Sequence, residues 1–171
     1  MNIQELRSQS TARLFLLTVV THVVYPAHFL SRLTSRINFS LGPGRRISNG
    51  FVSANFVFAY LSLAMFVPYI LVPEGHPVET VSDGLDTVSG LLLLIWSFKV
   101  RNRLNTLLTS APGATSWFHG FWTFFFQYLY INYKINTSRG NLQSLRGLCQ
   151  TCGYDLTGNE SGVCPECGET I

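Results

Sequence analysis

The chain has 171 residues, of which 47% are hydrophobic and only 12% are charged. Soluble domains carry about a quarter charged residues, so this composition argues against an ordinary soluble domain and favours a chain embedded in a lipid bilayer. The net charge of +3 combines +7 over residues 1–148 with −4 over residues 149–171, which contain no Lys or Arg. The change in charge predicts a membrane domain over 1–138, a linker over 139–148 and a separate tail over 149–171.

Residues 14–30 form the first apolar run, which His22, Pro26 and His28 interrupt. The run is marginal in length for a membrane span, so we expect a kinked transmembrane helix or a helix lying partly in the interface. A secretory signal peptide is the weaker alternative, because arginines follow the run and a small-residue cleavage pattern is missing. A basic loop is expected over residues 31–49, which contain four arginines and a helix-breaking Gly-Pro-Gly.

Residues 51–72 give the strongest signal in the chain, because none of these 22 residues is charged. As a helix they would extend about 33 Å, compared with roughly 30 Å of hydrocarbon in a bilayer, which predicts a transmembrane helix. The next segment, 73–86, has four acidic residues and no Lys or Arg. The positive-inside rule therefore places the basic loop in the cytoplasm and the acidic segment outside.

A second long helix is predicted over residues 85–104, which begin beside the acidic segment and end among basic residues. Together with the preceding helix it forms a transmembrane hairpin whose tip lies outside. Asp86 lies near the outer end of this predicted helix, and no carboxylate lies deep in an apolar run. A proton-coupled transporter usually needs such a group near the midplane, so we do not expect that class.

Residues 117–134 form a fourth apolar segment, rich in aromatic side chains, which suits an interfacial or tilted helix. The predicted fold is an all-α integral membrane protein, with a transmembrane helical hairpin, two flanking apolar helices and a small C-terminal zinc ribbon. Two to four of the segments span the bilayer fully. If the flanking segments are re-entrant or interfacial, both termini are cytoplasmic, which the basic residues of the linker favour.

Three of the helical segments end with the same pattern of a basic residue, a branched apolar residue and Asn. The three copies are Arg36-Ile37-Asn38, Arg103-Leu104-Asn105 and Lys134-Ile135-Asn136. We interpret them as helix ends at one membrane face, with a cation near each C-terminus and Asn as the cap. A degenerate internal repeat is the sharper alternative.

The membrane segments resemble small bacterial membrane proteins of domain-of-unknown-function family 4234 over residues 11–136. The first motif of that family matches Thr21, Tyr25, Pro26, Phe29, Arg32, Arg36 and Asn38, and the stretch FWTFFFQYLYINYKIN resembles its closing helix. The chain has Val23 and Val24 where the family usually has Gly, and the family lacks a constant metal tail. The resemblance implies a location in the bacterial inner membrane and no particular activity.

The tail contains two Cys-x-x-Cys pairs, Cys149 with Cys152 and Cys164 with Cys167, each followed by Gly. Two residues between ligands let both thiolates of a turn reach one ion, and two such turns complete a tetrahedron. The spacing predicts a zinc site and resembles rubredoxin-like zinc ribbons over 149–168. Iron or two disulfides are the alternatives. Four thiolates leave no open coordination position, so the metal would be structural.

The sequence contains no recognisable catalytic motif, so we expect a non-enzymatic accessory, adaptor or assembly subunit. Its expected partners are the lipid bilayer and a protein docked on a cytoplasmic ribbon. The acidic tail lacks the Lys and Arg that nucleic acid requires, so no nucleic acid is expected. One alternative is a membrane redox or transport component in which His22 and His119 contact haem or substrate. Another is a regulator that responds to zinc loss or thiol oxidation.

Overall fold

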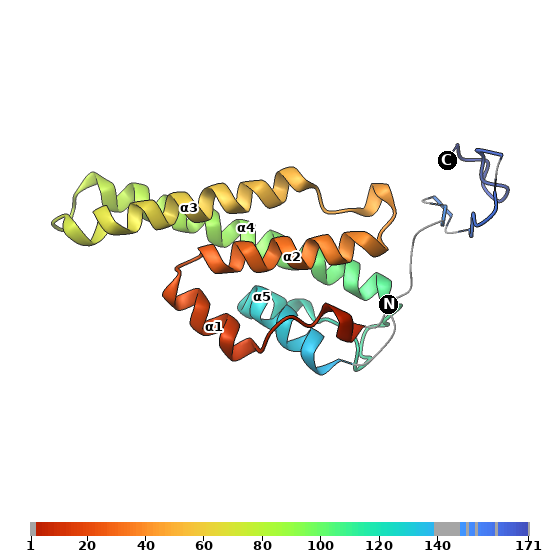
Figure 1. Ribbon diagram of the computed structural model, residues 1–171, viewed down its shortest axis with the longest axis horizontal. Coiled ribbons are helices and arrows are strands. Elements are labelled where there is room, and N and C mark those ends of the chain that lie inside the picture. The colour runs from red at the N-terminus through yellow and green to blue at the C-terminus, as the bar shows by residue number, and fades with distance from the viewer. Residues whose placement is uncertain (1–2, 139–147, 150, 153, 160, 171) are drawn as a thin grey trace.

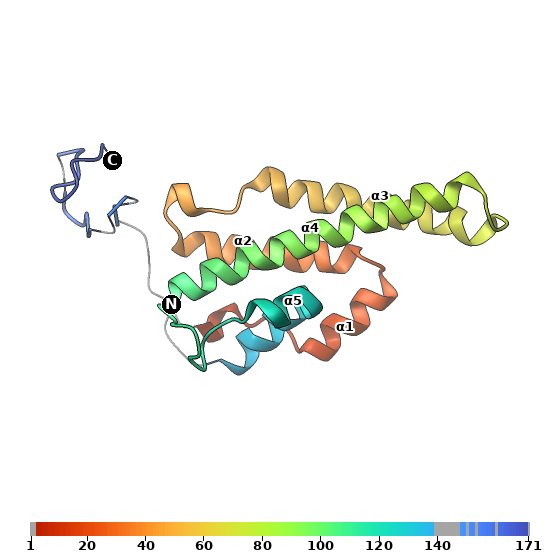
Figure 2. The ribbon, with the colours of Figure 1, turned by 180° about the vertical axis from the view of Figure 1, so that it is seen from behind.

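The computed structural model describes residues 3–138, 148–149, 151–152, 154–159 and 161–170. This part of the chain is mostly helical and contains two isolated antiparallel bridges in place of strands. The all-α prediction is therefore confirmed for it (Figures 1 and 2). The helices in chain order are η1 (Ile3–Leu6), α1 (Thr11–Val20), α2 (Val24–Ser40), η2 (Pro43–Arg45), α3 (Asn49–Leu71), α4 (Pro77–Leu107) and α5 (Gly120–Thr137), where η marks a 3-10 helix.

Helix α3 begins and ends close to the predicted bounds of 51–72. Ser48 precedes its first turn and accepts a hydrogen bond from the backbone N–H of Phe51 at 3.2 Å. A serine in this position satisfies one of the backbone donors that the first turn leaves open. Pro68 lies within the last turn of the helix, close to the hairpin tip.

Helix α4 is longer than the predicted 85–104, because it begins at Pro77. The ring of His76 accepts a hydrogen bond from the backbone N–H of Val78 at 3.2 Å and caps the helix. Proline is tolerated in a first turn, where its missing N–H would have no helical partner. Because the helix starts earlier, Asp86 lies well inside it, and the prediction that Asp86 is near the outer end is wrong.

Helices α3 and α4 pack as a hairpin, and each is long and apolar enough to cross a membrane. In their most apolar stretches only 17% and 28% of the residues are buried inside the protein. The core helix of a soluble protein would be mostly covered, whereas here large apolar side chains such as Ile70 and Leu71 are exposed. An uncovered apolar surface of this kind marks an interaction site with a membrane or another protein.

The first apolar segment is two helices, α1 and α2, instead of one helix over residues 14–30. The helix breaks at His22, whose backbone is left-handed with φ of 53°. Thr21 stabilises the break, because its hydroxyl donates to the carbonyl of Leu17 at 2.7 Å and accepts from the N–H of Tyr25 at 3.0 Å. Pro26 follows within the first turn of α2, where it is tolerated.

Helix α2 continues to Ser40, so the predicted loop over 31–49 is wrong for residues 31–40. Arg32 and Arg36 are exposed on one side of the helix, while Leu33 and Ile37 are buried on the other. The arginines therefore belong to the polar face of an amphipathic helix.

Helix α5 changes direction at Gln127, where φ is 42° and ψ is −125°. The backbone N–H of His119 donates to the hydroxyl of Tyr130 at 3.1 Å. A straight helix would separate these two residues by about 16 Å along its axis, so the chain must fold back at the break. The segment predicted as one helix over 117–134 is thus two short helical pieces that return to the same end of the bundle (Figure 2).

The core lies where α2, α4 and α5 meet. Trp96 of α4 is fully buried, and its indole N–H donates to the hydroxyl of Thr34 on α2 at 2.8 Å. Its ring packs edge-on against Phe29, with 6.2 Å between the ring centroids. Leu30 of α2 and Ile131 of α5 belong to the same hydrophobic cluster, and both are fully buried.

The asparagines of the repeated pattern hold neighbouring segments in place through hydrogen bonds to the backbone. Asn38 accepts from the backbone N–H of Ile47 at 2.9 Å and donates to its carbonyl at 2.8 Å. Asn105 forms the same pair of hydrogen bonds with Phe118, at 2.8 and 3.1 Å. Asn136 donates to a backbone carbonyl of the segment before α1 at 3.0 Å. The predicted capping role is wrong, since the C-cap residues are Leu41, Leu108 and Ser138.

In each copy of the pattern, the branched apolar residue and the cation also link neighbouring segments of the bundle. The branched apolar residues Ile37, Leu104 and Ile135 are all fully buried. The cations donate to backbone carbonyls of neighbouring segments: Arg36 to Leu6, Arg103 to Arg45 and Lys134 to Thr115. Each copy of the pattern therefore anchors a helix and closes a loop against it.

The charges are segregated along the bundle. Helices α2 and α4 carry Arg36 and Arg103 near their C-terminal ends, and both helices finish opposite the hairpin tip (Figure 1). At the tip, the carboxylate of Glu79 accepts from the N–H of Gly75 at 2.8 Å. Both ends of the helical part lie at the basic end, because Gln4 donates to the carbonyl of Ser138 while Arg36 reaches Leu6 at 3.4 Å.

Candidate metal centre

The four cysteines lie on two turns with the same backbone pattern. The N–H of Cys149 donates to the carbonyl of Tyr154 at 2.7 Å, and the N–H of Cys164 donates to that of Glu169 at 2.8 Å. One residue beyond these bonds lie the antiparallel bridges Leu148–Asp155 and Val163–Thr170. Each Cys-x-x-Cys pair is therefore held on a closed turn, as the spacing predicts.

Glycine has a specific role in the second turn. Gly168 has φ of 73°, which a residue with a side chain rarely adopts, and its N–H donates to the carbonyl of Cys164 at 2.9 Å. The equivalent role predicted for Gly153 lies outside the described residues.

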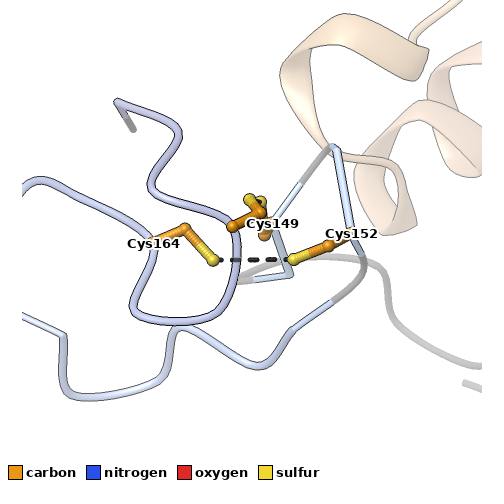
Figure 3. Close-up of side chains that lie close together, drawn as sticks. Cys149, Cys152 and Cys164 are labelled. Carbon is orange, nitrogen blue, oxygen red and sulfur yellow. Dashed lines mark hydrogen bonds between the residues drawn. The ribbon is translucent and has the colours of Figure 1, made fainter.

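The structure brings all four predicted cysteines together. Their sulfur atoms lie within 4.8 Å of one another. The Sγ atoms of Cys149 and Cys167 are 3.5 Å apart. Those of Cys152 and Cys164, which a dashed line joins in Figure 3, are 3.6 Å apart. A tetrahedral ion with bonds of about 2.3 Å to sulfur would place its ligands about 3.8 Å apart. The four thiols are free, and their spacing fits a metal ion better than two disulfides.

Within each turn, the two cysteines differ in their exposure to solvent. Cys149 and Cys164, the first cysteine of each turn, are 3% and 1% exposed. Cys152 and Cys167, the second of each turn, are exposed. One side of the cluster is therefore covered by the tail and the other faces outward. With four sulfur donors, the coordination of a bound ion would be complete.

The sulfurs of Cys149 and Cys167 differ in how readily they ionise. Backbone N–H groups of Cys152 and Thr151 lower the pKa of Cys149 to about 6. At Cys167 the N–H of Glu169 acts in the same direction, but loss of solvation and the neighbouring sulfurs raise the pKa to about 12. One thiolate thus forms readily and disfavours the next. A divalent cation among the sulfurs would remove this repulsion and favour four thiolates.

Side chains order the connection between the two turns without a hydrophobic core. Asp155 accepts from the N–H of Thr157 at 2.9 Å, and Asn159 accepts from the N–H of Ser161 at 2.8 Å. The amide of Asn159 also donates to the carbonyl of Val163 at 2.8 Å. Such Asx turns have a sequence signal, Asp-x-Thr and Asn-x-Ser, which the cysteine spacing alone does not predict.

The two histidines proposed as haem contacts have different neighbours. The Nε2 atom of His22 lies 3.2 Å from a carboxylate oxygen of Asp86, and its ring packs against Phe66. His119 precedes α5, and its backbone N–H donates to Tyr130. His22 therefore has the hydrogen-bond partner expected of a histidine that needs no haem.

No protein-family model matches the chain, and no curated protein or solved structure matches it either. The resemblance of residues 11–136 to domain-of-unknown-function family 4234 stays a prediction.

Proposed function

We propose that this chain is a non-enzymatic integral membrane protein of the bacterial inner membrane, an accessory or adaptor subunit whose cytoplasmic zinc ribbon docks a protein partner. The observation that carries the proposal is a cluster of four cysteine sulfurs within 4.8 Å, on a tail joined to a helical hairpin with uncovered apolar faces.

Membrane insertion is supported by the hairpin and by the charges at its two ends. Burial of the exposed apolar surface of α3 and α4 in hydrocarbon removes it from water, at roughly 25 cal/mol per Å². The basic end suits the cytoplasmic side and the acidic tip the outside. Because α1, α2 and α5 turn back within the bundle, both ends of the helical part share the basic end. This arrangement supports two full spans and a cytoplasmic tail.

Zinc is supported by the donor set. Four thiolates at tetrahedral spacing suit a structural zinc ion, and a tail of this size has too little core to fold without one. The ribbon would then be a rigid module with no open coordination position.

The surface of the ribbon supports a protein partner. Tyr154 and Val163, the residues beside the two turns, expose 44% and 42% of their surface. The tail also has four acidic residues and no Lys or Arg. Exposed apolar side chains within an acidic surface suit a partner with a basic rim around an apolar pocket, and they do not suit nucleic acid.

Site-specific crosslinking tests the docking role. A photoreactive phenylalanine derivative at position 154 should form one discrete protein adduct in intact cells, and zinc chelation in lysed cells should abolish it. The matched position is Tyr69 in α3, which is 40% exposed and should give lipid adducts. Protein adducts of equal yield at both positions, or none at position 154, would refute the docking role.

Topology and metal are tested on the same protein. A membrane-impermeant maleimide should leave the four cysteines unlabelled in intact cells, and the purified protein should contain about one zinc ion per chain. Labelling from outside would reverse the orientation. Iron in place of zinc would change the assigned metal.

A second candidate function is a membrane regulator that responds to zinc loss or thiol oxidation. The observation that favours it is the exposure of Cys152 and Cys167, which an oxidant could reach without unfolding the tail. It predicts that mild peroxide releases zinc and changes the yield of the adduct at position 154 while the protein stays in the membrane.

A further inference from the structure

A polar cluster joins three separate elements inside the apolar bundle. The carboxylate of Asp86 on α4 accepts a hydrogen bond from the hydroxyl of Ser62 on α3, which is fully buried. The same carboxylate oxygen lies 3.2 Å from Nε2 of His22, at the break between α1 and α2. The side chains of His22 and Asp86 are 31% and 42% exposed.

The backbone at His22 is held in an uncommon conformation at this site. Its φ of 53° lies in the left-handed region, which is unfavourable for a residue with a side chain. The ring is packed against Phe66 with 5.3 Å between the centroids, and Nε2 faces Asp86. The fold thus maintains a strained turn that presents an imidazole to a carboxylate.

The cluster lies at the same distance from the tip along both helices of the hairpin. Ser62 is nine residues before the end of α3, and Asp86 is nine residues after the start of α4. Nine residues of helix extend about 14 Å, close to half of the roughly 30 Å of hydrocarbon in a bilayer. In an inserted hairpin the pair would therefore lie within the hydrocarbon, where ionisable side chains mark ion or proton pathways.

We propose that His22 and Asp86, supported by Ser62, form a proton-binding site within the membrane domain. A lone carboxylate is unstable in hydrocarbon, but an imidazole and a carboxyl group that share one proton have no net charge. Uptake of a second proton makes the pair cationic, and loss of the shared proton makes it anionic. The ligand of the site is the proton.

Among the residues that the structure describes, His22 and Asp86 bring an imidazole and a carboxylate into contact at this depth. On α4, Asp83 lies one turn closer to the tip and is exposed, and Glu79 interacts with Gly75 at the tip. On α3, the contacts of the pair are the neutral Ser62 and Phe66. His28, the next histidine on α2, is hydrogen-bonded to Tyr60 at 3.1 Å.

The test uses full-length protein in lipid vesicles and rests on the membrane insertion proposed above. Dicyclohexylcarbodiimide modifies protonated carboxyl groups in apolar surroundings, and peptide mass spectrometry locates the product. We expect modification of Asp86 and none of Asp83, which a water-soluble carbodiimide should modify instead. His22→Gln should raise the rate at Asp86 about tenfold at neutral pH, as expected when an opposite charge within hydrogen-bonding distance is lost. His28→Gln is the matched control and should leave the rate unchanged.

When the protein resists alkaline extraction from the vesicles, either of two results would overturn the proposed proton-binding site. One is a failure to modify Asp86 at any pH, and the other is equal rates in His22→Gln and His28→Gln. If alkali extracts the protein, membrane insertion has failed, and the proton site in the hydrocarbon fails with it. Asp86→Asn should abolish the modification and identifies the product.

Discussion

The side chain of Asn38 forms two hydrogen bonds with the backbone of Ile47, nine residues further along the chain. It thereby supplies partners for the N–H and the carbonyl of Ile47. Asn105 does the same for Phe118, across the loop that joins α4 to α5. The repeated pattern of a cation, a branched apolar residue and Asn is therefore a device that fixes a loop to the helix before it.

Asn105→Ala should destabilise the bundle, because it leaves the buried N–H of Phe118 without its acceptor, while the carbonyl keeps the hydrogen bond from Arg101. The expected loss is about 1–3 kcal/mol for the unsatisfied donor. Thermal unfolding of the detergent-solubilised protein measures it. The matched control is Asn102→Ala, one turn earlier and exposed, and an equal fall in the midpoint for both variants would contradict the role of the pair.

Thr34→Val should also destabilise the core, because the buried indole N–H of Trp96 loses its acceptor. The change removes a hydrogen bond of 2.8 Å and keeps the volume of the side chain, so the expected loss is about 1–3 kcal/mol. Thr34→Ser retains the hydroxyl and should lose much less. Near-ultraviolet circular dichroism during thermal unfolding reports the packing around the tryptophan, and equal midpoints for the two variants would count against the hydrogen bond.

Metal removal should unfold the tail and leave the helical bundle intact. A chelator, or the substitution Cys164→Ser, should expose residues 149–171 to limited proteolysis, while the far-ultraviolet helical signal stays unchanged. Thr170→Val is the control in the tail, since its side chain is exposed and lies outside the cluster. A tail that resists protease equally without metal would show that zinc does not supply its folding energy.

In acid, protonation of Asp155 should remove a small stabilisation of the tail. The hydroxyl and N–H of Thr157 hydrogen-bond its carboxylate and hold the pKa of Asp155 below its ordinary value. Because the folded pKa lies below the unfolded one, the carboxylate stabilises the fold above about pH 4. This stabilisation is lost as the pH falls through the folded pKa. Thr157→Val should move the midpoint of Asp155 upward in an NMR titration of the zinc-loaded protein, and an unmoved midpoint would exclude the hydroxyl as the cause.

The elements that the sequence predicted well are those in which one physical effect dominates. Helix α3 has no charged residue after its cap, so its length and apolar character were sufficient to locate it. The cysteine spacing was equally direct, because two-residue gaps restrict each pair to one turn. Both predictions depend on local features that the rest of the chain does not modify.

The elements that the sequence missed depend on contacts between distant residues or on weak local signals. The breaks at His22 and Gln127 occur at residues with side chains, which have no intrinsic preference for positive φ, and tertiary packing holds them. The early start of α4 did have a local signal, because His76 and Pro77 followed by Glu79 resemble a helix N-terminus. Without that start Asp86 appeared terminal, and its contact with His22 across 64 residues is invisible in the sequence.

The two chain reversals, at His22 and within α5, also determine how much lipid the protein displaces on each side of a bilayer. With two full spans, the leaflet at the hairpin tip would contain only parts of α3 and α4. The leaflet at the basic end would contain the same two helices together with α1, α2 and both pieces of α5. The inserted protein would therefore be a wedge that is wider in the leaflet at the basic end, and a membrane crowded with it would tend to bend so that this leaflet becomes convex.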